Sequence, residues 1–330
     1  MLLRRVGWTG SGAALHAAAR RSVSFRCPSC SEPLAPHPPS DEAPDGGSMS
    51  LRCAAGHSID VAKQGHVNLI PSGRRRPSAP KVRGDADASI RARRTFFERG
   101  HYRQQAQGVA HAVSAALLES ESSGSCGSRR AQVLDAGCGE GRYLREIEHQ
   151  LGDRAQLWGT DLSKLAVRFA AKRQPTASLA VAASHRLPFD DAQFDVVLCV
   201  FAPRALSEFF RVLRPGGALI VADAGPRHLD GLKLALYEGR DPPAPVAPAD
   251  EGDTQATMQL PEPVRTVQET SLENFEAEDA RLLLAMTPFF WVASAELQLG
   301  LGADAPLQTT IDFAITTYRR RCSSEGGCAK

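Results

Sequence analysis

Val133-Leu-Asp-Ala-Gly-Cys-Gly-Glu-Gly141 is the stretch of this sequence that decides the fold. A short apolar run ends at Asp135, and glycines then occupy alternate positions up to Gly141, where a helical pattern begins. Glycine lets backbone N–H groups approach a ligand that side chains would exclude, and such turns between a strand and a helix are typical of nucleotide-binding α/β folds. The turn alone is weak evidence, because several dinucleotide folds share it.

The acidic residue Asp161 makes the interpretation sharper. It ends the next expected strand, in Gly159-Thr-Asp-Leu-Ser163, and the glycine spacing is not that of a dinucleotide fingerprint. This pairing indicates S-adenosylmethionine (AdoMet). We expect Gly137 and Gly139, after Asp135, to form the turn that binds the methionine end of AdoMet. Asp161 is expected to accept hydrogen bonds from both ribose hydroxyls. The alternative is that Asp161 caps the helix that follows it.

The surrounding sequence alternates apolar runs with helical patterns, which is typical of a parallel sheet with helical crossovers. Expected strands are Gln132–Ala136, Gln156–Asp161, Leu179–Ala183, Asp195–Phe201, Ala218–Ala222 and a last, antiparallel strand at Thr309–Tyr318; expected helices are Ala88–Gln107, Arg142–Leu151, Lys164–Arg173, Ala205–Leu213 and Glu273–Met286. The predicted fold class is α/β, a Rossmann-like class I AdoMet-dependent methyltransferase domain with a mostly parallel sheet, preceded by a small zinc ribbon.

The ribbon is expected from two short motifs. Cys27-Pro-Ser-Cys30 and Cys53-Ala-Ala-Gly-His57 supply three thiolates and one imidazole. Four such ligands in two close pairs suit one closed, tetrahedral, structural Zn²⁺ site, whereas a catalytic site would keep an open position. Incidental cysteines are the alternative.

These features divide the chain into five segments. Residues 1–24 are expected to be a leader or disordered extension, 25–60 the zinc-binding ribbon, 61–130 a basic linker and helical segment, 131–321 the AdoMet-dependent methyltransferase domain, and 322–330 a tail. The first 31 residues contain arginines but no Asp or Glu, as in a mitochondrial or plastid transit peptide. The alternative is a misplaced start codon in a bacterial gene, which would imply a cytoplasmic protein.

Charge and composition limit the classes of partner. Between Lys63 and Arg103, eleven Lys and Arg stand against three acidic residues, whereas between Arg240 and Arg281 three basic residues stand against ten acidic ones. The basic segment, with Arg74–Arg76, Lys81, Arg83, Arg93 and Arg94, is a candidate phosphate-binding surface, and a solvated linker is the alternative. No apolar run is long enough to span a membrane, and the cysteine pattern is no disulfide framework.

Several further motifs occur together between about residues 25 and 320. They are Asp60-Val-Ala-Lys-Gln-Gly-His-Val-Asn-Leu69, Arg93-Arg-Thr-Phe-Phe97, Gly100-His-Tyr102, Cys138-Gly-Glu-Gly141, Ala183-Ser-His-Arg-Leu-Pro-Phe189, Ala202-Pro203, Gly225-Pro-Arg-His-Leu229 and Met286-Thr-Pro-Phe289. With the cysteine motifs, this set resembles the family of 23S (large-subunit) rRNA guanine-N1 methyltransferases, zinc-ribbon enzymes of the class I fold.

The resemblance implies a ribbon that binds RNA and a domain that methylates N1 of a guanine in a large-subunit rRNA hairpin. It implies zinc ligands at Cys27, Cys30, Cys53 and His57, and cofactor contacts at Tyr102, Gly139, Glu140 and His228. The catalytic base is not identified, but the acceptor guanine is expected at the end of the fourth strand, in the region Phe201, Ala202, Pro203 and Arg204, where Phe201 is a candidate stacking surface.

Two other functions stay open at this point. The core motifs also suit a methyltransferase with a small-molecule acceptor, or a non-catalytic RNA-binding factor that keeps the fold. The sequence leaves open whether the chain forms a homodimer and which guanine is modified.

Overall fold

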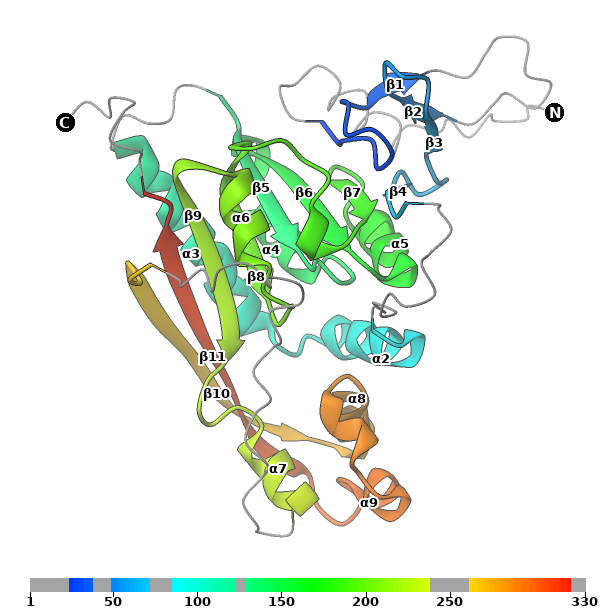
Figure 1. Cartoon of the computed structure of the whole chain (residues 1–330). Coiled ribbons are helices and arrows are strands. Elements are labelled where there is room, and N and C mark those ends of the chain that lie inside the picture. Colours follow the sequence, from blue (N-terminus) through cyan, green and yellow to red (C-terminus); the bar gives the residue numbers. More distant parts are fainter. Residues whose placement is uncertain (1–23, 38–48, 72–84, 123–128, 238–260, 322–330) are drawn as a thin grey trace, which may run out of the picture.

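A computed structural model describes residues 24–37, 49–71, 85–122, 129–237 and 261–321 (Figure 1). The expected tail, all but the last residue of the expected leader, and the basic residues Arg74–Arg76, Lys81 and Arg83 lie outside these ranges. Within them, no helix is long and apolar enough to cross a membrane.

An eight-stranded sheet forms the centre of the molecule, in the order β10-β11-β9-β8-β5-β6-β7-β4. From β9 to β4 all neighbours are parallel, whereas β11 runs antiparallel to both β9 and β10. The strands are β4 (Val67–Asn68), β5 (Ala131–Ala136), β6 (Ala155–Asp161), β7 (Ser178–Val181), β8 (Phe194–Val200), β9 (Leu213–Ala224), β10 (Arg265–Phe275) and β11 (Leu307–Arg319). The predicted mostly parallel sheet with an antiparallel last strand is confirmed.

Helices cover both faces of the sheet, so the core strands are buried on both sides. The first face packs on α3 (Arg103–Ser122), α4 (Arg142–Leu151) and part of α5 (Lys164–Arg173), and the second face packs on α6 (Leu206–Val212). In β5, Val133 points to the first face and Leu134 to the second, and neither is exposed. Burial on both faces explains the continuous apolar runs in the sequence.

The ribbon packs directly on the second face. Its strands β1 (Ala35–His37), β2 (Ser50–Arg52) and β3 (Ser58–Asp60) form a small antiparallel sheet beside the main one (Figure 1). Phe25 contacts Trp158 and Phe189, with ring centroids 5.2 and 5.4 Å apart. The N–H of Arg26 donates to the carbonyl of Pro188 at 2.8 Å. The segment after the ribbon then enters the main sheet as β4 at its edge.

Two expected helices differ from the structure. The helix expected at Ala88–Gln107 is two helices, α2 (Asp87–Glu98) and α3, because Gly100 and Tyr102 have positive φ angles of 93° and 58°. The helix expected at Glu273–Met286 begins only at Ala277, as α8 (Ala277–Ala285), since the residues up to Phe275 complete β10 by pairing with β11.

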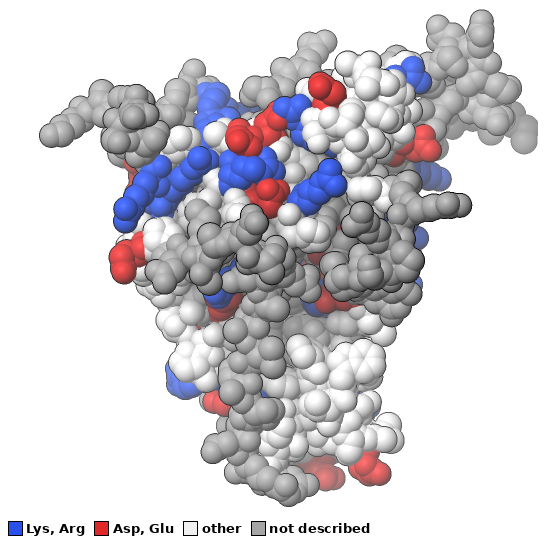
Figure 2. Space-filling view, in the orientation of Figure 1, with Lys and Arg blue, Asp and Glu red and all other residues white. Residues whose placement is uncertain are grey.

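A lower lobe below the carboxyl ends of the parallel strands contains α7 (Asp230–Tyr237), α8 and α9 (Ala295–Gly300), with α2 between this lobe and the sheet (Figure 1). Figure 2 shows Lys and Arg interspersed with Asp and Glu over the upper part of the molecule, and a mainly uncharged surface lower down.

Candidate cofactor site and metal centre

The turn after β5 requires its glycines. Gly137, Gly139 and Gly141 have positive φ angles of 98°, 53° and 82°, which side chains rarely adopt. A Cβ on Gly137 would lie 2.5 Å from the Cβ of Ala202, and one on Gly141 would lie 3.1 Å from that of Ala170. The N–H groups of Gly137 and Cys138 donate to the carbonyl of Thr160, which ties the turn to β6.

Asp161 lies at the end of β6, beside this turn. Its carboxylate accepts from the N–H of Gly139 at 3.0 Å and from that of Ser163 at 2.8 Å. The N-cap of α5 is Ser163, whose hydroxyl accepts from the N–H of Ala166, so the alternative role of Asp161 as the helix cap is wrong. Asp161 instead borders the glycine turn.

Three acidic side chains gather at the turn: Asp135, Glu140 and Asp161. Burial, and then the charges of Asp161 and Glu140, raise the pKa of Asp135 to about 8. Among the described residues, neither carboxylate oxygen of Asp135 has a hydrogen-bond partner. Burial also raises the pKa of Glu140, against the influence of Arg93 and Arg173. A buried, unpartnered carboxylate is costly, so the site is complementary to a cation with hydrogen-bond donors.

Arg93 is a site residue that the sequence analysis assigned differently. Its guanidinium pairs with Asp85 and lies near Gly139, 3.8 Å from where a Cβ would stand. Burial lowers its pKa, but Asp85 and Glu140 outweigh burial and raise it. Arg93 therefore faces the glycine turn, whereas Arg94 ion-pairs with Glu98 and lies toward α5, over the ring of Phe169. The helical spacing of α2, which separates neighbours by about 100°, was the signal that could have distinguished them.

Tyr102 and His228 come together in an aromatic cluster. Their ring centroids are 6.1 Å apart, and both rings contact Phe313. Nδ1 of His228 accepts from the N–H of Asp312 at 3.1 Å, and burial lowers the pKa of His228 to about 4. The imidazole is therefore neutral at physiological pH, with its remaining proton on Nε2.

The region Phe201–Arg204 follows β8 and touches the same cluster. Phe201 is 47% exposed, has a φ angle of 47°, and lies 5.5 Å from His228 and 4.7 Å from Phe313 between ring centroids. Ala202 packs against Gly137. Arg204 instead ion-pairs with Asp223 at the end of β9. The structure thus brings Ala202 to the glycine turn and Phe201 to the aromatic cluster, while Arg204 pairs with Asp223.

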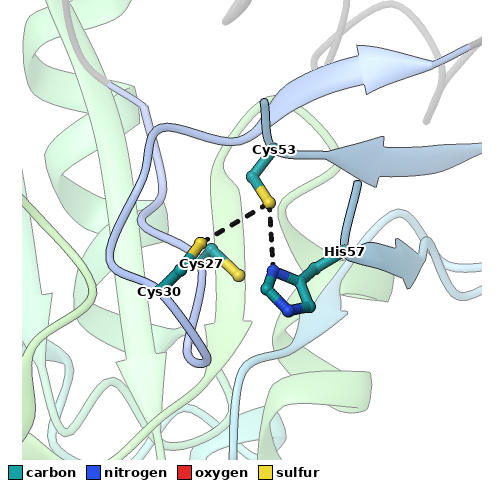
Figure 3. A group of neighbouring side chains, drawn as sticks. All are labelled: Cys27, Cys30, Cys53 and His57. Atoms are coloured by element: carbon teal, nitrogen blue, oxygen red, sulfur yellow. Dashed lines mark hydrogen bonds between the residues drawn. The ribbon is translucent and has the colours of Figure 1, made fainter. Parts of the chain in front are cut away.

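The four residues of the cysteine motifs converge on one point (Figure 3). Their ligand atoms all lie within 4.8 Å of one another. Sγ of Cys53 lies 3.6 Å from Sγ of Cys30 and 3.3 Å from Nδ1 of His57. Gly56, with a φ angle of 84°, allows the turn between Cys53 and His57. The fourth residue of the group is Cys27, which is buried. Three sulfurs and one imidazole at these separations suit a zinc ion with four protein ligands.

Two family models match the chain. One, described as a methyltransferase domain, matches residues 133–217, and the other, a zinc ribbon described as "RlmA, N-terminal", matches residues 25–77. The first match begins in β5 and ends in β9, and the second includes all four residues of the metal centre.

Three relatives match over much of their length. A 23S rRNA (guanine(748)-N(1))-methyltransferase of Streptomyces fradiae is 36% identical over 64% of this chain and 67% of its own. Two provisionally named 23S rRNA (guanine-N(1)-)-methyltransferases are also similar. The protein of Micromonospora griseorubida is 41% identical over 62% of this chain and 67% of its own length. The protein of Bacillus subtilis is 30% identical over 88% of this chain and 95% of its own length. The chain therefore belongs to the 23S rRNA guanine-N1 methyltransferase family, and it combines that family's zinc ribbon with a class I methyltransferase domain.

Proposed function

We propose that this protein transfers the methyl group of AdoMet to N1 of a guanine in a hairpin of large-subunit rRNA. The observation that carries this proposal is Asp135, which is buried beside a glycine turn and has no hydrogen-bond partner in the described part of the chain. The chain belongs to this family throughout its ribbon and its sheet. A family member with an intact cofactor turn is best explained as an active enzyme, not as a non-catalytic RNA-binding factor.

The cofactor site is proposed at the carboxyl ends of β5 and β6. The ammonium group of AdoMet would be held by Asp135, whose oxygens have no hydrogen-bond partner among the described residues, and the ribose by Asp161. The whole proposed set is Tyr102, Asp135, Gly137, Gly139, Glu140, Asp161 and His228, to which we add Arg93 because its half-buried guanidinium lies beside Gly139. Its guanidinium suits the carboxylate of the methionine end.

The metal centre is proposed to hold one structural Zn²⁺ through Cys27, Cys30, Cys53 and His57. The strands of the ribbon are only three residues long, so the ion would supply much of the local folding free energy. We propose residues 25–60 as the ribbon, 61–130 as the connecting segment and 131–321 as the methyltransferase domain.

Bound AdoMet supplies an electrophilic methyl group on its sulfonium. The chain's own residues must orient the acceptor and exclude water, because alignment provides most of the rate acceleration. We place the acceptor guanine against Phe201, an exposed ring held next to the glycine turn by a left-handed backbone. Backbone strain at an exposed aromatic residue is typical of a functional position. The neutral imidazole of His228 lies beside this ring and can donate from Nε2.

Nucleoside analysis tests the function directly. The full chain is incubated with AdoMet carrying a labelled methyl group and with a large-subunit rRNA transcript, and the RNA is digested and separated by mass. The label is expected in 1-methylguanosine and absent from 2-methylguanosine and 7-methylguanosine. Label in another nucleoside, or unlabelled RNA with a protein that binds AdoMet, would reject the proposal and favour a different acceptor.

A further inference from the structure

Helix α5 carries a row of basic side chains that the cofactor site does not use. Its sequence, Lys164–Arg173, contains four Lys or Arg and no acidic residue. Lys164, Arg168 and Lys172 are exposed and follow one another at a spacing of four. Residues four apart lie on the same helix face, about 6 Å from one another, and like charges at this spacing weaken a helix. The row is therefore not explained by helix stability.

Within the described residues, none of these three side chains has an ion-pair or hydrogen-bond partner. Basic residues elsewhere differ in this respect. Arg129 and Arg214 both pair with Asp195, and Arg211 pairs with Glu208 and Asp191. Lys164, Arg168 and Lys172 are thus available to an external anion.

The row ends in a cavity of about 480 Å³ between α2, α4 and α5. Its lining includes four Lys or Arg against two Glu, and both Glu are engaged by neighbours. Glu98 pairs with Arg94, and Glu148 accepts from Gln174. Arg145, on the opposite wall, has no partner among the described residues. The ring of Phe169 forms an apolar floor, with the guanidinium of Arg94 4.4 Å from its centroid.

Helix α5, which carries the row, lies below the ribbon and above α2 in Figure 1. Near the ribbon, burial lowers the pKa of His66, next to β4, and the positive charge of Arg168 lowers it further. At the other end, Nη1 of Arg173 lies 3.2 Å from Oε1 of Glu140 in the glycine turn. One surface therefore connects the two sites that act on the same RNA in the proposed function.

We propose that Lys164, Arg168 and Lys172, with Arg145 in the adjoining cavity, bind the phosphate backbone of the substrate RNA between the ribbon and the cofactor turn. The inference rests on the proposed function for the identity of the RNA. The surface consists of unpaired cations in a regular row. Such cations bind phosphate groups and do not distinguish one base from another.

The test compares two double variants of the full chain. Arg168→Gln with Lys172→Gln removes two charges from the row, and Arg265→Gln with Arg281→Gln removes two exposed charges from β10 and α8. Glutamine is a good helix former, so α5 should persist, which melting temperature and AdoMet binding verify. Binding of a labelled rRNA hairpin transcript is measured at several KCl concentrations.

The row variant should bind RNA on the order of 10-fold more weakly than the control, and its slope of log affinity against log salt should be smaller by roughly 1.5. The KM for RNA should rise while kcat at saturating RNA stays unchanged. Equal affinities and slopes for the two variants would overturn the inference. If instead the row governs RNA binding but the wild type produces no 1-methylguanosine, this surface stands and the proposed function fails.

Discussion

The metal centre and the cofactor turn are built in opposite ways. The turn lies at the end of a six-residue strand inside an eight-stranded sheet, and backbone hydrogen bonds hold it to the neighbouring strand. The metal centre joins two short loops beside strands of three residues, and its His57 is exposed. One site is shaped by the fold of the sheet, whereas the other brings together ligands that only a bound ion would hold tightly.

This difference implies that the metal centre and the cofactor turn can each be lost without loss of the other. The sheet should keep its cofactor turn when the metal is lost, because the turn's hydrogen bonds lie within β5 and β6. The ribbon should keep its metal when the turn is damaged, because its four ligands come from residues 27–57 alone. The contact of Phe25 with Trp158 and Phe189 joins the two parts, so the position of the ribbon depends on the sheet.

Removal of the metal should have the largest effect. Structural zinc contributes about 10–16 kcal/mol in small zinc-binding peptides, so a chelator or Cys53→Ser should disorder the ribbon. RNA methylation should then fall below detection, while AdoMet affinity stays within about two-fold, as the sheet remains folded. Metal content by mass spectrometry and AdoMet titration check this, and zinc added back after chelation is the control. A variant that retains one zinc per chain would contradict the ligand assignment.

Gly137→Ala should have the next largest effect, on the cofactor turn only. The added Cβ meets Ala202 at 2.5 Å, and the backbone has a φ angle of 98°. Strain of about 1–3 kcal/mol predicts AdoMet affinity lower by roughly 10- to 100-fold, with zinc content unchanged.

Gly152→Ala is the matched control for that change. Gly152 also has a positive φ angle, of 52°, but no atom lies within 4 Å of an added Cβ. AdoMet affinity measured by calorimetry should be unchanged in this variant. Equal losses of affinity in both variants would mean that the turn responds to general destabilisation and not to the contact with Ala202.

Asp135→Asn should weaken AdoMet binding by about 10-fold, because it removes a charged acceptor worth roughly 1.5–3 kcal/mol while keeping the shape of the side chain. The metal centre should be unaffected. Calorimetric titration with AdoMet measures the change. An unchanged affinity would remove Asp135 from the site.

The pH dependence of AdoMet binding should show a smaller, graded effect. The pKa of Asp135 is about 8 in the free protein, so the carboxyl is mostly protonated below this pH. A cationic ligand favours the carboxylate, and binding must therefore release a proton. Affinity should rise with pH from about 6.5 and level off above about 8. The difference between wild type and Asp135→Asn isolates this titration from that of the ligand's amine, and parallel profiles would contradict it.

The sequence predicted the parts of the molecule that depend on short-range patterns. The strand, glycine turn and helix around Gly137, and the convergence of Cys27, Cys30, Cys53 and His57, follow from local spacing. The strand β10 was missed, because its residues are nearly all exposed or half-buried with no clear alternation and its partner β11 comes much later in the chain. The inward direction of Arg93 could have been read from the helical spacing of α2, whereas the left-handed backbone of Phe201 arises from tertiary packing, which charge and composition do not encode.

A single crystal of the full chain with S-adenosylhomocysteine, measured at the zinc absorption edge, tests the two-site account most directly. We expect one anomalous peak bonded to Cys27, Cys30, Cys53 and His57, and the ligand's ammonium group within hydrogen-bond distance of Asp135 with its ribose at Asp161. A metal elsewhere, or a ligand bound away from the glycine turn, would contradict the account.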